Sequence, residues 1–534
     1  MSVESVPISA VADRVAGIER LRVWPRFALT AGVGLVSNFA YAPFFFFPAL
    51  AVGLVFLVWL IDGAARSPTP MRAAFWRAWV FATFYFLGGL YWVGQSFTQV
   101  DGALIFMLPA MLAMWCGLAL FWAAAAAVAV KVWPSGPARI FVFALTIMIA
   151  EWLRGHLFGG LPWNLPGYVW QAGGEVSQAA SALGIYGLSM VTVLALASPA
   201  TIADRAPTAA RVAPALCAAL GLGLLWGAGL QRLEAAPRNQ PGVAVVRVAD
   251  AGFSQEEKWR PGNEATVFRG YLDLLDGPSP SQADIVSWPE SAIPALLLEN
   301  PDMMEEIGAR LGLRTLITGT VRSEPGANGP TYFNSAVVLT GGEAGARLGQ
   351  IYNKSRLVPF GEFIPLWREI EPLARGLKLT ALQQIGSGFE PGGPPARMIV
   401  PGGPQAAFVI CYESIFPDFI PRGDARPDWI VNVTNDAWFG TQTGPYQHYN
   451  QARYRAIEEG LPLARAASGG ISALIDPYGR AIAATGLAGG AAESALPPPL
   501  AGTFYSRFSG AVTAIVFLAV LLLGIALSRV EKKK

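Results

Sequence analysis

Cys411 is the residue in this chain most able to do covalent chemistry. It ends a short apolar, strand-like run, Ala-Phe-Val-Ile-Cys, and it is the one cysteine of three outside the long apolar segments. Glu290 and Lys354 each follow a strand-like run too, in the contexts Ser-Trp-Pro-Glu and Tyr-Asn-Lys. A thiol, a carboxylate and an amine at the ends of three strands predict a covalent acyl-transfer site.

The chemistry of a thiol assigns an expected task to each partner. A thiol has a reference pKa near ~8.5, so only a minority of it is ionised at neutral pH. A reactive thiol therefore needs a base or a cation beside it. Glu290 is the expected base. Lys354 is the expected cation, and with a backbone N–H after Cys411 it is expected to stabilise the oxyanion of a tetrahedral intermediate.

The small numbers of histidines and cysteines disfavour catalysis by histidine and metal binding. The chain has two histidines, His156 and His448, and we expect His448 to be a hydrogen-bonded structural residue. Three cysteines cannot build a disulfide framework, and they form no metal-binding cluster with histidine. We therefore expect no metal and no cofactor.

The composition is that of a membrane protein. Of 534 residues, 53% are hydrophobic and 14% are charged, against roughly 25% charged in an ordinary soluble protein. The net charge of +2 makes nucleic acid an unexpected partner. Eight apolar segments are candidates for spanning helices, which need ~20 residues. They lie near residues 26–40, 44–62, 75–95, 103–130, 138–157, 178–203, 212–231 and 508–529.

The spacing of these segments predicts three domains. Residues 1–235 form a membrane domain with seven transmembrane helices, residues 236–503 form a globular catalytic domain, and residues 504–534 form the eighth helix with a basic tail. The globular part alternates strand-like and helical patterns, which is typical of an α/β sandwich with chemistry in the loops at strand ends.

Basic residues predict the orientation in the membrane. The positive-inside rule places loops rich in Lys and Arg in the cytoplasm. These loops contain Arg14, Arg20, Arg22, Arg26, Arg66, Arg72, Arg77, Lys131, Arg139, Arg205, Arg211 and the tail 529–534. Both termini are therefore expected in the cytoplasm, and the globular domain in the periplasm of a bacterium with two membranes. The polar start, without a clear cleavage site, makes the first helix an expected signal anchor.

Longer motifs around the three residues resemble a known family. The order Glu, Lys, Cys in these contexts is similar to the nitrilase superfamily. The motifs at 353–362 (Asn-Lys-Ser-Arg-Leu-Val-Pro-Phe-Gly-Glu), 411–413 (Cys-Tyr-Glu) and 432–440 (Asn-Val-Thr-Asn-Asp-Ala-Trp-Phe-Gly) narrow the resemblance to the apolipoprotein N-acyltransferase family. The segments 444–448, 452–458, 38–44, 151–155 and 162–164 resemble the same family. The likeness covers nearly the whole chain after residue 25.

This resemblance implies a fold and a set of site residues. The expected fold is a polytopic helical membrane domain, with about eight transmembrane helices, joined to a nitrilase-like α-β-β-α sandwich. Cys411 would be the nucleophile, Glu290 the general base and Lys354 the oxyanion-stabilising amine. Supporting or substrate-binding residues would be Glu362 beside the lysine, Tyr412 and Glu413 beside the nucleophile, and Trp259 on a loop near the substrate entrance.

The implied reaction joins two lipid substrates in the inner membrane of a bacterium. A membrane phospholipid would donate its sn-1 acyl chain to Cys411. The α-amine of a diacylglyceryl-modified apolipoprotein would then accept it. The chain departs from the family pattern at 246–250 (Val-Arg-Val-Ala-Asp), where a Gln-x-Asn-type run is usual, and at 460–462 (Gly-Leu-Pro), where Gly-Arg-Pro is usual.

Two other functions remain possible from the residues themselves. A membrane-tethered amidase that hydrolyses a small C–N substrate would carry the same three residues, but one anchoring helix would serve it. A transporter or receptor would place charges deep in several helices, and these segments are nearly free of charge in mid-span.

Overall fold

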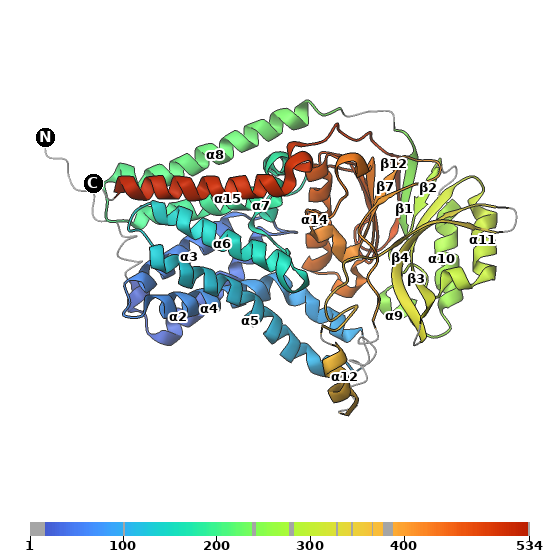
Figure 1. Ribbon diagram of the computed structural model, residues 1–534, viewed down its shortest axis with the longest axis horizontal. Helices are drawn as coiled ribbons and strands as arrows, with labels where there is room; N and C mark the ends of the chain where they lie inside the picture. The colour runs from blue at the N-terminus through green and yellow to red at the C-terminus, as the bar shows by residue number, and fades with distance from the viewer. Residues whose placement is uncertain are drawn as a thin grey trace. The chain divides into compact units, whose positions relative to one another are not determined.

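The computed structural model describes residues 17–99, 102–237, 242–276, 282–326, 329–342, 345–365, 367–376 and 388–531 (Figure 1). Arg14 and Lys532–Lys534, which contribute to the predicted orientation, lie outside these residues. The chain forms two compact units. The first contains the described parts of 1–91, 108–234 and 508–534, and the second contains those of 92–107 and 235–507. The predicted domain boundaries stay predictions.

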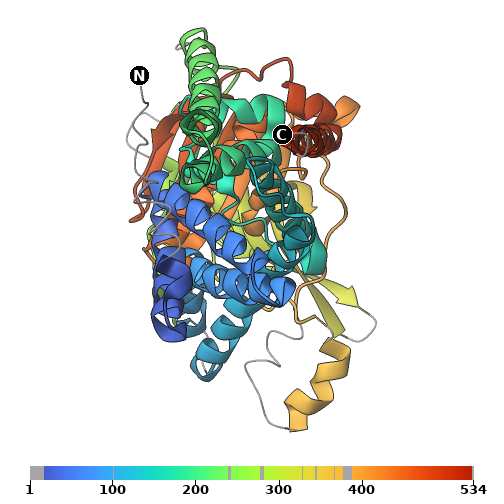
Figure 2. The ribbon, with the colours of Figure 1, turned by 90° about the vertical axis from the view of Figure 1, so that its left-hand side faces the viewer.

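The first unit is built from helices. They are α2 (Val23–Val36), α3 (Pro48–Ala65), α4 (Pro70–Leu90), α5 (Leu104–Ala129), α6 (Ala138–His156), α7 (Ala180–Ala197), α8 (Thr208–Glu234) and α15 (Phe504–Glu531), of which α5 and α15 begin in the second unit. Figure 2 looks along α15, so that this helix is seen end-on. Short 3-10 turns such as Ser37–Ala40 and Ser198–Ala203 extend several of them.

Six of these helices are long and apolar enough to cross a membrane: α3, α5, α6, α7, α8 and α15. The protein is therefore a multi-pass membrane protein. The expected segments near 26–40 and 75–95 are present as α2 and α4. However, α2 has 14 residues, and α4 carries Arg72 and Arg77, which lower its hydropathy.

Close packing and buried polar contacts hold the helices of this unit together. A Cβ at Gly34 of α2 would lie 2.4 Å from the Phe81 carbonyl oxygen of α4, so the small residue lets the two backbones approach. On α6, Arg154 pairs with Glu151 one turn away, and both side chains are buried. The Trp122 indole also donates to Glu151, at 2.5 Å. The buried charges of Glu151 and Arg154 are thus paired, and Trp122 joins α5 to this pair.

The second unit contains two six-stranded mixed sheets. The first has the order β12-β1-β2-β3-β4-β5 and the second β11-β10-β9-β8-β7-β6. The strands of the first sheet are β1 (Val245–Asp250), β2 (Ile285–Ser287), β3 (Thr315–Gly326), β4 (Gly329–Thr340), β5 (Arg347–Asn353) and β12 (Gly490–Ala495). Those of the second are β6 (Arg397–Met398), β7 (Ala406–Ile410), β8 (Trp429–Asn435), β9 (Leu463–Ser468), β10 (Ala473–Ile475) and β11 (Ala481–Ala484).

Both sheets have a parallel centre. β1, β2 and β3 run parallel to one another, as do β7, β8 and β9, and the remaining pairs are antiparallel. The sheets face each other, with β1 against β9, β3 against β8 and β4 against β7. The central strands are buried on both faces, which explains their continuous apolar runs.

Helices cover the two outer faces of this double sheet. Figure 1 shows α10 (Glu264–Asp276) and α11 (Pro301–Leu311) on one side of the strands and α14 (Thr443–Glu459) on the other. Apolar residues of α10 such as Leu272 pack with Trp288 and Leu316 in a core between helix and sheet. Two short helices, α9 (Gln255–Lys258) and α12 (Trp367–Gly376), lie in loops. The layers are α-β-β-α, and the predicted sandwich is confirmed.

Candidate active site

The ends of three strands bring Glu290, Lys354 and Cys411 together. Lys354 directly follows β5 and Cys411 directly follows β7, while Glu290 lies three residues after β2. Because β2 and β5 belong to one sheet and β7 to the facing sheet, the site lies at one end of the sandwich, where the two sheets meet. All three side chains are buried, with Lys354 at 1% exposure and Cys411 at 7%.

A close backbone approach fixes the loop that carries Glu290. Ser291 has a φ of +46°, and the N–H of Gly319 donates to the Pro289 carbonyl at 3.1 Å. A Cβ at Gly319 would lie 2.4 Å from Cα of Glu290, so a larger residue in this part of β3 would push the carboxylate out of place. Glu290 therefore sits on a rigid support.

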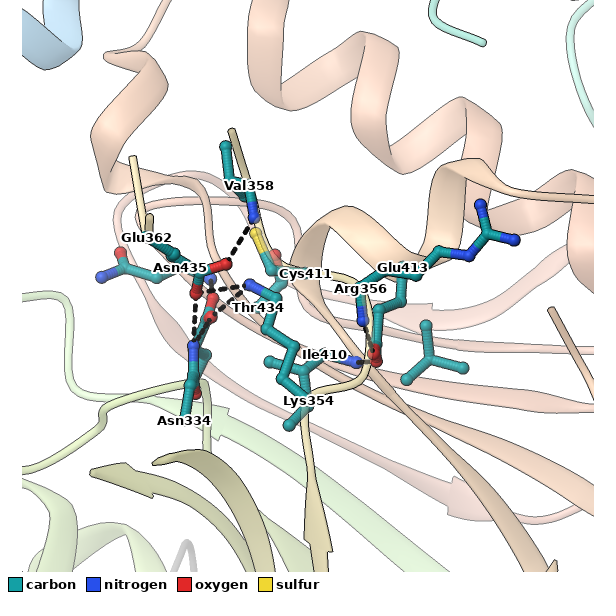
Figure 3. A network of polar contacts seen from close by, with 12 residues as sticks. Asn334, Lys354, Arg356, Val358, Glu362, Ile410, Cys411, Glu413, Thr434 and Asn435 are labelled. Atoms are coloured by element: carbon teal, nitrogen blue, oxygen red, sulfur yellow. Dashed lines mark hydrogen bonds and ion pairs between the residues drawn. The ribbon is translucent and has the colours of Figure 1, made fainter. Parts of the chain in front are cut away.

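Two carboxylates and one amide surround the Lys354 amine (Figure 3). Nζ donates to Glu290 Oε1 at 3.2 Å and to Glu362 Oε1 at 2.8 Å. Asn334, from β4, donates its amide to the same two oxygens, at 2.7 and 2.8 Å. Burial would lower the pKa of Lys354, but the charges of Glu290 and Glu362 raise it well above its usual value. The amine is therefore a fixed cation.

The other carboxylate oxygens are also held by backbone donors. Glu290 Oε2 accepts from the N–H of Asn435 at 2.9 Å, and Glu362 Oε2 accepts from the N–H of Val358 at 2.8 Å. Every oxygen of this pair thus has a donor, which fixes the direction in which each carboxylate points.

Cys411 lies in a strained backbone conformation. Its φ is +48°, in the left-handed region, which costs a non-glycine residue on the order of 1–3 kcal/mol. Burial and the charge of Glu290 raise the pKa of the thiol above its usual value, while Lys354 and a hydrogen bond with Thr434 lower it in part. The resting sulfur is therefore a thiol, and a nearby base is needed to ionise it.

Glu413 ties together the loops that carry Lys354 and Cys411. Its buried carboxylate accepts from the N–H groups of Ser355 at 2.7 Å, Arg356 at 3.1 Å and Ile410 at 2.7 Å. The Tyr352 hydroxyl also donates to it, at 2.8 Å. Burial raises the pKa of Glu413 to about 7. The neighbouring Tyr412 is buried, and its ring packs edge-on against Phe416.

Trp259 is the exposed member of the predicted set. It follows α9, and 49% of its surface is exposed. The helix is anchored beside the site, because Lys258 donates from Nζ to the Ser291 carbonyl at 3.0 Å and Gln255 accepts from the Asn435 amide at 3.2 Å. Burial lowers the pKa of Lys258 to about 8.

The structure thus groups the predicted residues and adds others. Glu290, Lys354, Glu362 and Cys411 share one site, Glu413 lies behind it, and Trp259 lies on a segment anchored to it. Sequence reasoning missed Asn334 and Lys258. Asn334 interrupts the apolar run of β4 and was the available signal. A fixed cation, a carboxylate and a buried thiol together can ionise a nucleophile and stabilise an oxyanion.

Comparisons with known proteins cover nearly the whole chain. Residues 33–198 match the family model of the apolipoprotein N-acyltransferase N-terminal domain, and residues 247–490 match that of carbon-nitrogen hydrolases. The apolipoprotein N-acyltransferase of Rhodopseudomonas palustris is 37% identical over 531 residues, which cover 96% of this chain and 97% of that protein. That of Bradyrhizobium diazoefficiens is 38% identical over 530 residues, or 96% of each chain.

Among solved structures, an amidase from Nesterenkonia is similar at 16% identity and a TM-score of 0.33, covering 48% of this chain and 92% of that one. The two family models lie on the two parts of the chain in the order that the sequence motifs predicted. Together with the full-length relatives, they show that the chain belongs to the apolipoprotein N-acyltransferase family.

Proposed function

We propose that this protein transfers the sn-1 acyl chain of a membrane phospholipid, through a thioester on Cys411, to the α-amine of a diacylglyceryl-modified apolipoprotein. The observation that carries the proposal is the buried Lys354 cation, held by two carboxylates within electrostatic reach of the Cys411 thiol. The full-length relatives named as apolipoprotein N-acyltransferases support the choice of acceptor.

In the first step the thiol becomes an acyl thioester. Glu290 takes the proton of Cys411, and the thiolate attacks the ester carbonyl carbon. Lys354 and the N–H of Tyr412 stabilise the negative oxygen. The tetrahedral intermediate collapses as the C–O bond breaks, and the leaving lysophospholipid alkoxide takes the proton from Glu290.

In the second step the acyl chain moves to nitrogen. The α-amine of the acceptor attacks the thioester carbonyl, and Glu290 takes one proton from the attacking nitrogen. The C–S bond then breaks, and the Cys411 thiolate recovers the proton. An amide is more stable than a thioester, so the step is favourable. Two bulky substrates thus use one site in turn.

The supporting residues have separate tasks in this proposal. Glu362 holds the Lys354 amine, since it accepts from Nζ at 2.8 Å while its second oxygen is fixed by the Val358 N–H. Tyr412 and Glu413 shape the surroundings of the nucleophile, and Glu413 does so by joining its loop to that of Lys354. Trp259 lies on an exposed segment, where it would contact an entering lipid.

The membrane arrangement completes the proposal. Residues 1–235 and 504–534 would hold the catalytic domain, residues 236–503, at the periplasmic surface of the bacterial inner membrane, with both termini in the cytoplasm. Both substrates are lipids in the bilayer, so the spanning helices would keep the site where they are found.

Transfer and hydrolysis can be separated in one assay. Full-length protein in vesicles is given a phospholipid with an isotopically labelled sn-1 chain and a diacylglyceryl-cysteinyl peptide. We expect the label in an amide on the peptide, and no transfer to the same peptide with an acetylated α-amine. Labelled free fatty acid as the main product with both peptides, or cleavage of small aliphatic amides, would instead favour the amidase.

A further inference from the structure

A chain of buried polar side chains lies behind the nucleophile and reaches it from the second sheet. Arg465, on β9, donates from Nη2 to Asp436 Oδ2 at 2.5 Å. Asp436 Oδ1 faces His448 Nδ1 at 2.7 Å and also accepts from the Thr434 hydroxyl at 3.0 Å. Arg465, Asp436 and His448 are completely buried. A buried carboxylate that accepts from a guanidinium and an imidazole orients that imidazole firmly.

The far side of the imidazole contacts the backbone of the nucleophile itself. His448 Nε2 lies 3.2 Å from the carbonyl oxygen of Cys411 and 2.8 Å from the Ser414 hydroxyl. The Ser414 hydroxyl lies 2.9 Å from the same carbonyl oxygen and donates to it. A carbonyl oxygen can only accept, so a protonated Nε2 suits this position. The polar chain therefore ends on the peptide group between Cys411 and Tyr412.

We infer that His448 is a positioning residue for acyl transfer, which acts by holding and polarising the Cys411–Tyr412 peptide group. The inference rests on the proposed function. A peptide group is planar and trans, so its N–H points opposite to its carbonyl. A donor that fixes the Cys411 carbonyl oxygen therefore also aims the Tyr412 N–H, which is the proposed oxyanion donor.

Two physical effects follow from this contact. Hydrogen bonding at a carbonyl withdraws electron density from the peptide nitrogen and makes its N–H a stronger donor. It also opposes relaxation of Cys411 out of its positive φ of +48°. A histidine that only filled space in the core would need neither the contact with Cys411 nor the Arg465–Asp436 pair behind it.

Two amide variants separate these roles. Asparagine at position 448 places its side-chain amide nitrogen where Nδ1 of the histidine lies, and glutamine places it where Nε2 lies. His448→Gln keeps a donor for the Cys411 carbonyl, and we expect acylation of Cys411 by phospholipid vesicles within about tenfold of wild type. His448→Asn loses it, and we expect acylation about 100-fold slower with little change in KM. The readout is the rate of the acyl-enzyme mass gain in single turnovers at several phospholipid concentrations, which gives the maximal rate and the half-saturating concentration separately.

The comparison also distinguishes the two proposals. A wild-type protein that never forms the adduct would overturn the proposed function, and this inference with it. A wild type that acylates, with the Asn and Gln variants equally active, would overturn the inference alone. His156→Gln, at the end of α6, is the control for replacing a histidine, and we expect wild-type acylation from it.

A milder variant guards against misfolding of the histidine variants. Ser414→Ala removes one of the two groups that contact the Cys411 carbonyl and leaves the Arg465–Asp436–His448 chain intact. We expect acylation about tenfold slower with an unchanged melting temperature. If the His448 variants do not fold and Ser414→Ala acylates at the wild-type rate, the inference is wrong.

Discussion

Replacing Glu290 by glutamine is expected to stop acylation of Cys411 and, at the same time, to let its thiol ionise at lower pH. Loss of a general base costs about 10²–10⁴-fold in rate. Yet the negative charge of Glu290 raises the pKa of Cys411, so removing that charge lowers this pKa. At a given pH below the thiol pKa, the variant has more thiolate than the wild type and reacts faster with iodoacetamide.

Two measurements on Glu290→Gln test whether acylation becomes slower while alkylation becomes faster. Acylation is followed by intact mass after mixing with phospholipid vesicles, and alkylation of Cys411 is followed against pH by peptide mapping. A small thiol such as glutathione, added to the same sample, is the internal reference for reagent activity. Glu256→Gln, a change at an exposed carboxylate on α9, is the matched control. Wild-type acylation in Glu290→Gln, or an alkylation profile moved to higher pH, would contradict the assignment of Glu290 as the base.

Replacing Lys354 by methionine is expected to damage both catalysis and stability. The amine is buried between two carboxylates, so its loss leaves Glu290 and Glu362 facing each other without the cation. Breaking a buried ion pair costs about 3–5 kcal/mol of unfolding free energy. Loss of an oxyanion donor lowers the acylation rate by a further ~10²–10³-fold. Melting in detergent and single-turnover acylation measure the two effects.

The double variant Lys354→Met/Glu362→Gln separates the two effects. It removes one of the unpaired carboxylates, so we expect the melting temperature to recover in part. Acylation should remain as slow as in Lys354→Met, because the oxyanion still lacks its cation. Recovery of the acylation rate together with stability would show that Lys354 only supports the structure.

Sequence periodicity predicted much of the sandwich, because its central strands are buried on both faces. The strand-like runs 285–288 (Ile-Val-Ser-Trp), 407–410 (Ala-Phe-Val-Ile) and 429–433 (Trp-Ile-Val-Asn-Val) coincide closely with β2, β7 and β8. The patterns did not indicate β9 to β12, since these short strands are rich in alanine and contain only two of the β-branched residues that indicate strands, Ile475 and Ile482. In the membrane unit, six of the eight expected helices are long and apolar enough to span.

The candidate site was predictable only where the residue types themselves indicated a reaction. A thiol, a carboxylate and an amine after three strands indicated Cys411, Glu290 and Lys354, and their catalytic roles stay predictions. Asn334 and Lys258 were not predicted, although Asn334 is a polar residue within β4, because their contacts with Glu290 and Ser291 join residues distant in sequence. His448 was expected to be a hydrogen-bonded structural residue, and its contacts with Asp436 and Ser414 confirm the hydrogen bonding.

Formation of a thioester on Cys411 is the central claim, and intact-protein mass spectrometry tests it most directly. Wild type and Cys411→Ala are incubated with phospholipid vesicles without an acceptor peptide. We predict a mass gain of one fatty acyl chain on the wild type alone, which hydroxylamine removes. An adduct that persists in Cys411→Ala, or no adduct while free fatty acid accumulates, would contradict the account.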